Sequence, residues 1–164
     1  MEYLKQLSTN DGRVYYDMLQ RIEAEIFAMH NEVNGASYED YLKWLEKMDD
    51  WAHERNLPDG YVKQVTYWLM SNETPVGYVR LRFKLTEKSR EYGGSFGYAI
   101  DPLYRKKGFG SILVRQIIEL AKKEKIEEFF SMVDKNNIAS NRIMSKNGGF
   151  IFKENEVYNY YKFW

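Results

Sequence analysis

The spacing of apolar residues changes near residue 62, and this change limits the possible folds more than any other feature of the sequence. Between Val14 and Met29, apolar side chains recur at steps of three and four residues, which predicts an amphipathic helix. Ser37-Tyr-Glu-Asp40 is typical of a helix N-terminus, and Pro58-Asp59-Gly60 is a turn signal. The segment 10–57 is therefore predicted to contain two helices.

Strand patterns follow this helical part. Residues 62–70 are rich in β-branched and aromatic side chains, and residues 76–85 alternate apolar with polar ones, which predicts a hairpin. A polar loop, TEKSREY, separates the hairpin from a third strand at 93–100, which ends at Asp101-Pro102. The three strands are expected to form one meander.

The remainder of the chain alternates helices with strands. The sequence predicts helices at 108–123 and 138–147, and strands at 128–133, 150–153 and 157–164. This order of elements is typical of a mixed α+β fold with one central sheet. Because there is no repeat, linker or low-complexity segment, residues 1–164 are predicted to form a single domain.

Composition argues against several classes of function. The 24 basic residues balance 24 acidic ones, so no overall field would attract nucleic acid or an anionic membrane. The chain has no cysteine, which rules out disulfides, thiolate zinc sites and a cysteine nucleophile. His30 and His53, both on predicted helices, have no companions at metal-ligand spacing, so no metal site is expected. No apolar run suits a signal peptide or a membrane helix, and a cytoplasmic protein is predicted.

The stretch YRKKGFG at 104–110 lies between a predicted strand and the start of a predicted helix. At such a turn, unpaired backbone N–H groups meet the positive end of the helix dipole and can bind phosphate. Gly108 and Gly110 would let ligand oxygens approach the backbone. The nucleotide motifs do not fit, because no Gly-Lys-Ser/Thr follows and Leu113 stands where the dinucleotide motif has its third glycine. The simpler alternative is a turn whose cations are only solvated.

The loop Arg105-Lys-Lys-Gly108-Phe-Gly110 resembles the Arg/Gln-x-x-Gly-x-Gly/Ala loop of the GNAT acetyltransferase superfamily. GYAIDP at 97–102 and NNIASNRIMSKNGGF at 136–150 flank it in the family's order, so the resemblance covers about residues 62–152. The chain also resembles a bacterial branch of predicted acetyltransferases with no assigned substrate. The resemblance implies a mostly antiparallel central sheet of about six or seven strands flanked by about four helices. Residues 62–152 would form its coenzyme-binding core and 153–164 a terminal strand.

The resemblance further implies an acetyl-CoA-dependent N-acetyltransferase, in which a primary amine of a small molecule or peptide attacks the thioester directly. Acetyl-CoA would be the cosubstrate, and no metal would take part. The strand before the loop would bind pantetheine through its backbone, the loop would bind the diphosphate, and Asn137 would bind pantetheine unless it serves only as a helix N-cap. The residues so implied are Tyr98, Ala99, Ile100, Arg105, Lys106, Lys107, Gly108, Phe109, Gly110, Ser111 and Asn137.

One position departs from the family pattern. Many members have a tyrosine on the final helix that can protonate the leaving thiolate, and alignment on Asn137, Ser140 and Ile143 puts Met144 there. Methionine cannot donate a proton. Either the thiolate leaves unassisted or another hydroxyl serves, for which Tyr98 and Ser140 are the candidates.

The acceptor pocket is expected near residues 30–41, because the family forms it largely from the first two helices and their junction. Glu32, Glu39 and Asp40 could attract a cationic amine there. The rival hypothesis is a CoA-binding protein that has lost turnover. The acceptor's identity, the use of acyl groups longer than acetyl and a homodimeric assembly stay open at this stage.

Arg80, Arg82 and Lys84 line one face of a predicted strand. They either steer an anionic acceptor or coenzyme, or they are simply solvated. Nucleic-acid binding through the basic turn is a third hypothesis, which the neutral net charge disfavours.

Overall fold

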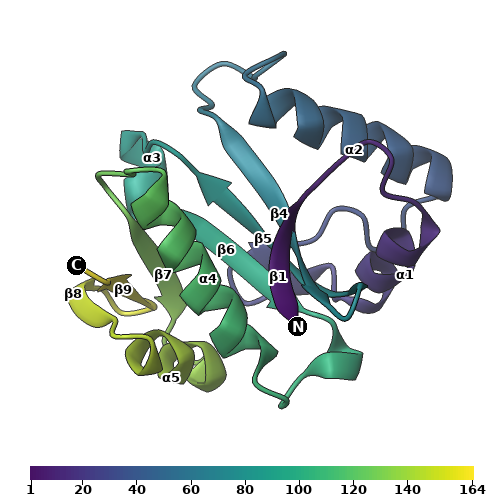
Figure 1. The fold of residues 1–164 in the computed structure, drawn as a ribbon. Coiled ribbons are helices and arrows are strands. Elements are labelled where there is room, and N and C mark those ends of the chain that lie inside the picture. Colours follow the sequence, from purple (N-terminus) through teal and green to yellow (C-terminus); the bar gives the residue numbers. More distant parts are fainter.

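Two antiparallel sheets meet at strands β6 and β7, and helices cover both faces of the first sheet (Figure 1). The computed structural model describes residues 1–164. The first sheet has the order β1-β4-β5-β6, the second has the order β7-β9-β8, and β2 and β3 form a separate hairpin. The elements are β1 (Glu2–Gln6), α1 (Arg13–Arg21), β2 (Glu25–Ile26), β3 (Met29–His30), α2 (Tyr38–Ala52), β4 (Gln64–Ser71), β5 (Thr74–Arg82), α3 (Glu87–Glu91), β6 (Phe96–Ile100), a 3-10 turn (Pro102–Tyr104), α4 (Phe109–Lys123), β7 (Phe130–Asp134), α5 (Ile138–Lys146), β8 (Phe150–Glu154) and β9 (Tyr158–Lys162).

The arrangement confirms the predicted mixed α+β class with a mostly antiparallel sheet, although that sheet is divided in two. The predicted hairpin is present as β4 and β5, with Ser71 opposite Thr74. Asn72 and Glu73 form its turn, and both have positive φ, 47° and 68°. Positive φ at both central residues is the backbone of a tight two-residue hairpin turn, because it matches the twist of the flanking strands.

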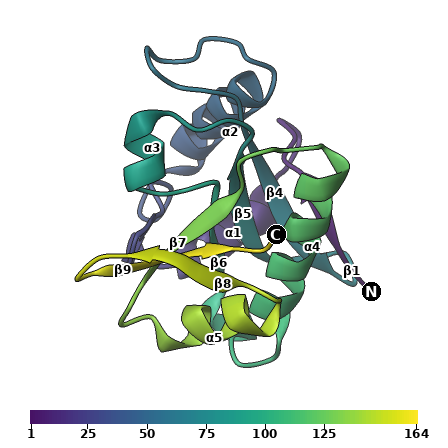
Figure 2. The same ribbon diagram turned by 90° about the vertical axis from the view of Figure 1, so that its left-hand side faces the viewer.

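The division between the sheets occurs because β6 pairs only with β5, and β7 only with β9. A single bridge joins the two sheets, between Gly94 and Ser131. Gly94 has φ +65°, and a Cβ at this position would lie 2.8 Å from the carbonyl oxygen of Phe130, so only glycine allows this approach. In Figure 2 the second sheet lies toward the viewer, with α5 beneath it and α4 at its side. Beyond the bridge, β6 therefore has one edge without a partner strand, facing a gap.

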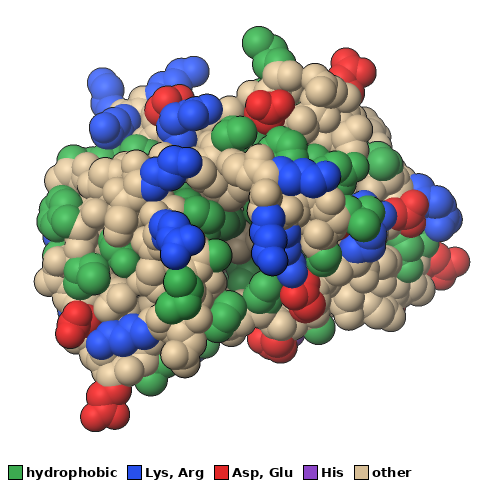
Figure 3. Space-filling model, turned by 90° about the horizontal axis from the view of Figure 1, so that it is seen from below, with side chains coloured by type: hydrophobic (Ala, Val, Ile, Leu, Met, Phe, Trp, Pro, Cys, Tyr) green, Lys and Arg blue, Asp and Glu red, His purple; other side chains and the backbone are tan.

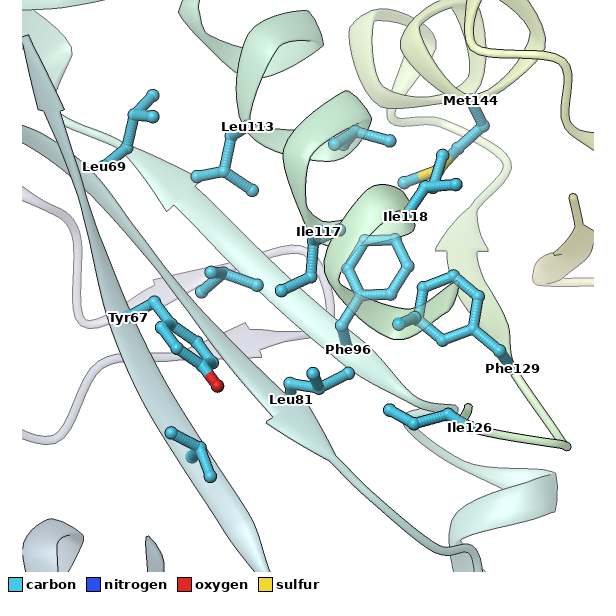
Figure 4. Packing of buried hydrophobic residues seen from close by; sticks show 14 of the residues in the cluster. Tyr67, Leu69, Leu81, Phe96, Leu113, Ile117, Ile118, Ile126, Phe129 and Met144 are labelled. Carbon is cyan, nitrogen blue, oxygen red and sulfur yellow. The ribbon is translucent and has the colours of Figure 1, made fainter. Parts of the chain in front are cut away.

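Helix α4 packs its apolar stripe against one face of the first sheet (Figure 4). Leu113, Ile117 and Ala121 recur every four residues and are fully buried. They belong to the same cluster as Leu81 of β5 and Phe96 of β6. Each such large apolar side chain contributes about 1.5–3 kcal/mol on burial. This packing fixes the N-terminus of α4 at the end of β6.

Helices α1 and α2 cover the opposite face with an aromatic cluster that includes Tyr41, Trp68 and Tyr78. Asp11 is buried within it and accepts hydrogen bonds from Trp68 Nε1 at 2.7 Å and from Lys5 Nζ at 2.6 Å. A buried carboxylate is tolerated where charged and polar donors compensate it. This cluster attaches the N-terminal part to the coenzyme-binding core predicted at 62–152.

The predicted helix at 14–29 is wrong beyond Arg21. Asn31 Nδ2 donates to the carbonyls of Leu19 and Ile22 at 2.9 and 3.0 Å, and Asn34 Nδ2 donates to the carbonyl of Ile22 at 2.9 Å. These side chains satisfy the carbonyl groups that a continuing helix would have used. The chain then forms the β2–β3 hairpin, so His30 lies on a strand and not on a helix.

Besides β2 and β3, two further elements were missed by the sequence patterns. TEKSREY was predicted as a loop but contains α3, whose capping box joins Thr86 and Ser89 reciprocally. Residues 2–6 form β1, the edge strand that pairs with β4. No helix is long and apolar enough to cross a membrane.

Candidate functional site

The turn before α4 presents a run of unpaired backbone amides. The N–H groups from Lys106 to Ser111 donate no hydrogen bond, and the first amide of this region that does is that of Ile112, to the carbonyl of Gly108 at 3.2 Å. Free amides at a helix N-terminus carry partial positive charge and point outward along the axis. The turn for which anion binding was predicted therefore has free amides at the start of a helix.

The shape of the turn comes from two left-handed residues, Lys106 with φ 62° and Gly108 with φ 87°. Alternation of left-handed and right-handed backbone directs successive N–H groups into one concave nest. A Cβ on Gly108 would meet no atom within 4 Å, so the space above this residue is open. Gly110 has the opposite role, because its Cβ would lie 2.8 Å from Ile143 Cδ1 of α5. Because glycine has no Cβ, α5 can pack closely on the start of α4.

Arg105 holds the turn in place instead of offering its charge to solvent. Its Nη1 and Nη2 donate to Glu23 at 2.9 and 2.6 Å, and its Nε donates to the carbonyl of Ile100 at 3.0 Å. The guanidinium of Arg105 lowers the pKa of the Glu23 carboxyl mainly through this hydrogen bond, against a smaller opposing effect of burial. Lys106 and Lys107 are the exposed cations of the turn.

A second pair of the same kind joins Arg21, at the end of α1, to Asp101, which is fully buried before the turn. Arg21 Nε and Nη2 donate to Asp101 Oδ2 at 3.0 and 2.7 Å. The hydrogen bond to Asp101 raises the pKa of Arg21 more than burial lowers it. Partners 80 and 82 residues apart leave no local signal, so sequence reasoning missed Arg21 and Glu23.

The backbone of β6 is open toward the gap. Asp101 N donates a hydrogen bond of 2.9 Å to the carbonyl of Val76, and this bond shows which residues of β6 form hydrogen-bonded pairs with β5. Because antiparallel pairs alternate, Ala99 exchanges its hydrogen bonds with β5, whereas Tyr98 and Ile100 direct theirs away from β5. Of the three strand residues predicted to contact a ligand through the backbone, Tyr98 and Ile100 thus face the gap.

The structure brings together the two hydroxyls that the sequence offered as proton donors. Tyr98 of β6 and Ser140 of α5 lie with their hydroxyl oxygens 2.9 Å apart. Burial raises the pKa of the Tyr98 hydroxyl, and the hydrogen bond with Ser140 offsets part of this rise. Tyr98 is therefore a neutral O–H group at physiological pH.

Helix α5 begins as predicted at Asn137, whose side chain accepts a hydrogen bond from Ser140 N at 3.2 Å. Asn147 Nδ2 donates to the Ser111 hydroxyl at 3.2 Å and so links α5 to the start of α4. Met144 is fully buried in the cluster beneath α4, near Ile118 (Figure 4). The Met144 side chain therefore packs in the core and is not accessible to a ligand.

Seen from below the view of Figure 1, this end of the molecule is hollowed (Figure 3). Several Lys and Arg side chains surround the hollow, and hydrophobic side chains lie within it. A ligand with a phosphate end and an apolar arm matches this combination.

On the other side of the sheet, the β2–β3 hairpin covers the gap. Met29 packs on β6, where its Sδ lies 3.1 Å from the position that a Cβ of Gly97 would take, and Ala28 packs on the second sheet. A surface pocket of about 300 Å³ lies next to this segment, in the region predicted for the acceptor. Its lining residues are Glu32, Val33, Ala36, Asp40, Lys43, Trp44 and Lys47. No group of three or more His, Cys, Asp or Glu side chains is placed to hold a metal ion.

Comparison with known proteins gives one family. The sequence model of the family described as "Acetyltransferase (GNAT) family" matches residues 19–150. No curated protein sequence matches the chain.

Solved structures with the same fold include acetyltransferases that are described with different substrates. The N-acetyltransferase PseH of Campylobacter jejuni, solved with acetyl coenzyme A, has 19% sequence identity and a TM-score of 0.64, with 98% of this chain and 96% of that chain covered. The ribosomal-protein-S5-alanine acetyltransferase of Vibrio fischeri has 14% identity and a TM-score of 0.73, with coverage of 98% and 91%. A chimera of the spermidine N-acetyltransferase SpeG from Vibrio cholerae and hSSAT has 16% identity and a TM-score of 0.67, with coverage of 99% and 95%. At these identities the likeness shows the fold alone.

Proposed function

Because the chain belongs to the acetyltransferase (GNAT) family, we propose that it transfers the acetyl group of acetyl-CoA directly to a primary amine. Acetyl-CoA is the donor in this family, and the protein is an N-acetyltransferase. The observation that carries the proposal is the run of free amides from Lys106 to Ser111 at the start of α4.

The coenzyme diphosphate fits the nest formed by these amides. Backbone N–H groups at a helix N-terminus bind phosphate without the entropy loss of ordering long side chains. Lys106 and Lys107 add charge from the rim, while Arg105 acts through Glu23 and the Ile100 carbonyl to hold the turn. Phe109, Gly110 and Ser111 contribute amides in this account.

The pantetheine arm would lie in the gap between β6 and β7. Its amides can pair with the free backbone groups of Tyr98 and with the free N–H of Ile100, whose carbonyl is taken by Arg105, in the manner of a strand added to a sheet edge. Ala99 contributes through its neighbours, since its own backbone groups belong to the ladder with β5. Asn137 caps α5 three residues before Ser140, which contacts Tyr98 of β6, and we assign it the roles of both N-cap and ligand contact.

In the transfer step, the amine nitrogen forms a bond to the acetyl carbonyl carbon and the carbon–sulfur bond breaks. The attacking amine loses one proton to water, the leaving thiolate gains one from Tyr98, and the tyrosinate so formed regains a proton from water. Tyr98 is the proton donor to the thiolate, because its hydroxyl is protonated at neutral pH and Ser140 orients it; the raised pKa makes it a weaker acid and favours recovery of its proton after transfer. The N-terminal part, residues 10–57, shapes the side from which the amine arrives.

The proposal is tested by release of coenzyme A from acetyl-CoA in the presence of polyamines, amino acids, aminoglycosides and peptides. Thiol release that requires both the protein and an amine, together with an acetylated product by mass spectrometry, is the expected result. The alternative is a CoA-binding protein without turnover, and tight acetyl-CoA binding with no thiol release for any amine would support it.

A further inference from the structure

The side chain of Arg80, on β5, is largely buried, and its guanidinium donates no hydrogen bond. Its side chain is 25% exposed, and its only ionic contact is with Glu32 Oε1, 4.0 Å from Nη2. Its Nε is buried without any partner. By contrast, the guanidinium groups of Arg21, Arg82 and Arg105 all donate hydrogen bonds. Buried donors without acceptors cost free energy, so this group is suited to a ligand that supplies oxygens.

The position of Arg80 places it on the acceptor side of the gap. Arg80 lies directly opposite Gly97 of β6, so the two residues share one face of the sheet. Met29 of the β2–β3 hairpin packs on that same face, at Gly97. Gly97 adjoins Tyr98, whose backbone faces the gap proposed for the coenzyme arm. An amine that reaches the thioester from beneath the hairpin would pass close to Arg80.

The surroundings of Arg80 carry an excess of positive charge. Glu32 is the one carboxylate in contact, and it already accepts from Trp44 Nε1 at 2.8 Å and from Lys47 Nζ at 3.1 Å. Burial raises the pKa of the Glu32 carboxyl, but Lys47, Arg80 and Trp44 lower it by more, so that Glu32 is ionised and its charge is compensated. Arg82 adds a second guanidinium close enough to interact with Arg80.

We propose that Arg80 binds a carboxylate of the acetyl acceptor, so that the accepted amines are amino acids or acidic peptides and not polyamines. This inference rests on the proposed acetyl transfer and names its acceptor class. A planar guanidinium pairs with a carboxylate through two parallel hydrogen bonds, which would satisfy the donors that are now free. Nearby positive charge also lowers the pKa of an amine and favours the neutral form that attacks a thioester.

Matched pairs of amines test this inference through kcat/KM for thiol release. A series of ω-amino acids of increasing chain length is compared with the corresponding amides, beginning with 4-aminobutyrate and 4-aminobutanamide. A second pair consists of C-terminally amidated Ala-Glu and Ala-Gln, which separates peptides from free amino acids. Putrescine serves as the polyamine. We expect at least one carboxylate to be preferred over its amide by about tenfold or more.

Three variants assign any preference to Arg80. Arg80→Gln is expected to remove the preference through a higher KM for the carboxylate, with little change for the amide. Arg80→Lys keeps the positive charge without the paired donors and should retain only part of the preference for the carboxylate. Lys84→Gln removes one positive charge from an exposed position four residues away and should change neither substrate. If Arg80→Gln does not fold, the inference is tested by comparing the carboxylate preference of the wild-type protein with that of the Arg80→Lys variant.

The outcomes distinguish this inference from the proposed function. Acetylation of amides or putrescine at equal or higher efficiency overturns the carboxylate assignment and leaves acetyl transfer standing. An equal effect of Arg80→Gln on both members of a pair also overturns it. Absence of turnover with every amine contradicts both.

Discussion

The hydroxyl oxygens of Tyr98 and Ser140 lie 2.9 Å apart, although the two residues are separated by 42 positions in the chain. They come from different elements, β6 and α5, which approach each other where the two sheets diverge. The contact supplies a part-buried hydroxyl pair, and Met144, at the position where many relatives have a tyrosine, lies in the core. The proposed proton donor of this enzyme is therefore on the strand and not on the last helix.

Replacement of Tyr98 by phenylalanine tests this assignment. We expect kcat to fall about a hundredfold, as is usual on loss of a general acid, while KM for acetyl-CoA changes little. Burial raises the pKa of Tyr98 above its ordinary value of 10.0, so the wild-type rate should show no loss from tyrosine ionisation up to pH 9. Steady-state kinetics from pH 6 to 9 measure both effects, and an unchanged kcat for Tyr98→Phe would mean that the thiolate leaves without this acid.

Replacement of Gly108 by valine should weaken acetyl-CoA binding at least tenfold. Gly108 has φ +87°, where a β-branched residue is strained by about 1–2 kcal/mol, and the added side chain would enter the space in front of the free amides. Gly60→Val is the matched control, because Gly60 has φ +80° and equally open surroundings but lies after α2. Calorimetric titration should show reduced affinity for the first variant alone. Equal affinities would refute the assignment of the turn.

The ion pair between Glu23 and Arg105 gives the protein a pH-dependent term in its stability. Because the folded-state pKa of Glu23 is lowered from 4.5, the stabilisation is fully present above about pH 4.5 and is lost as pH falls through the lowered value. Glu23→Gln should therefore be less stable than the wild type at pH 7, and the difference should shrink toward pH 3. Urea denaturation across this range measures it, and a difference that does not vary with pH contradicts the pairing.

Met144 and Asn137, at the two ends of α5, should respond differently to truncation. Met144→Ala should lower the free energy of unfolding by about 2–5 kcal/mol, because it leaves a cavity in a fully buried cluster, with little effect on the rate while the protein is folded. Asn137→Ala loses an N-cap worth about 1 kcal/mol and, in addition, a proposed coenzyme contact. Thermal denaturation and KM for acetyl-CoA separate the two effects. A larger kinetic defect in Met144→Ala would show that α5 had been aligned wrongly with the family.

Local signals in the sequence were sufficient for most elements. The helices predicted at 108–123 and 138–147 are present as α4 and α5, and Asn137 is the N-cap of α5. These features depend on neighbours within a few residues, so a single sequence contains them. The turn before α4 was predicted for the same reason, since its glycines and its place before a helix are local properties.

What the sequence could not predict depends on contacts between distant segments. The end of α1 at Arg21 is set by the side chains of Asn31 and Asn34, which bond back to its last carbonyl groups. The sequence predicted that Arg105 binds phosphate, whereas in the structure its guanidinium donates to Glu23, 82 residues away. The missing hydrogen bonds of Arg80 are likewise visible only in three dimensions.

Binding of acetyl-CoA is proposed to depend on contacts between its diphosphate and the amides from Lys106 to Ser111. Two-dimensional NMR of the ¹⁵N-labelled protein, with backbone assignments, tests it residue by residue. Addition of acetyl-CoA should shift these amide resonances strongly. S-acetylpantetheine lacks the diphosphate, so it should shift the amide resonances of Tyr98 and Ile100 and leave those of Lys106 to Ser111 unchanged. The account is contradicted if acetyl-CoA leaves the Lys106–Ser111 amides unchanged, or if the fragment without diphosphate shifts them equally.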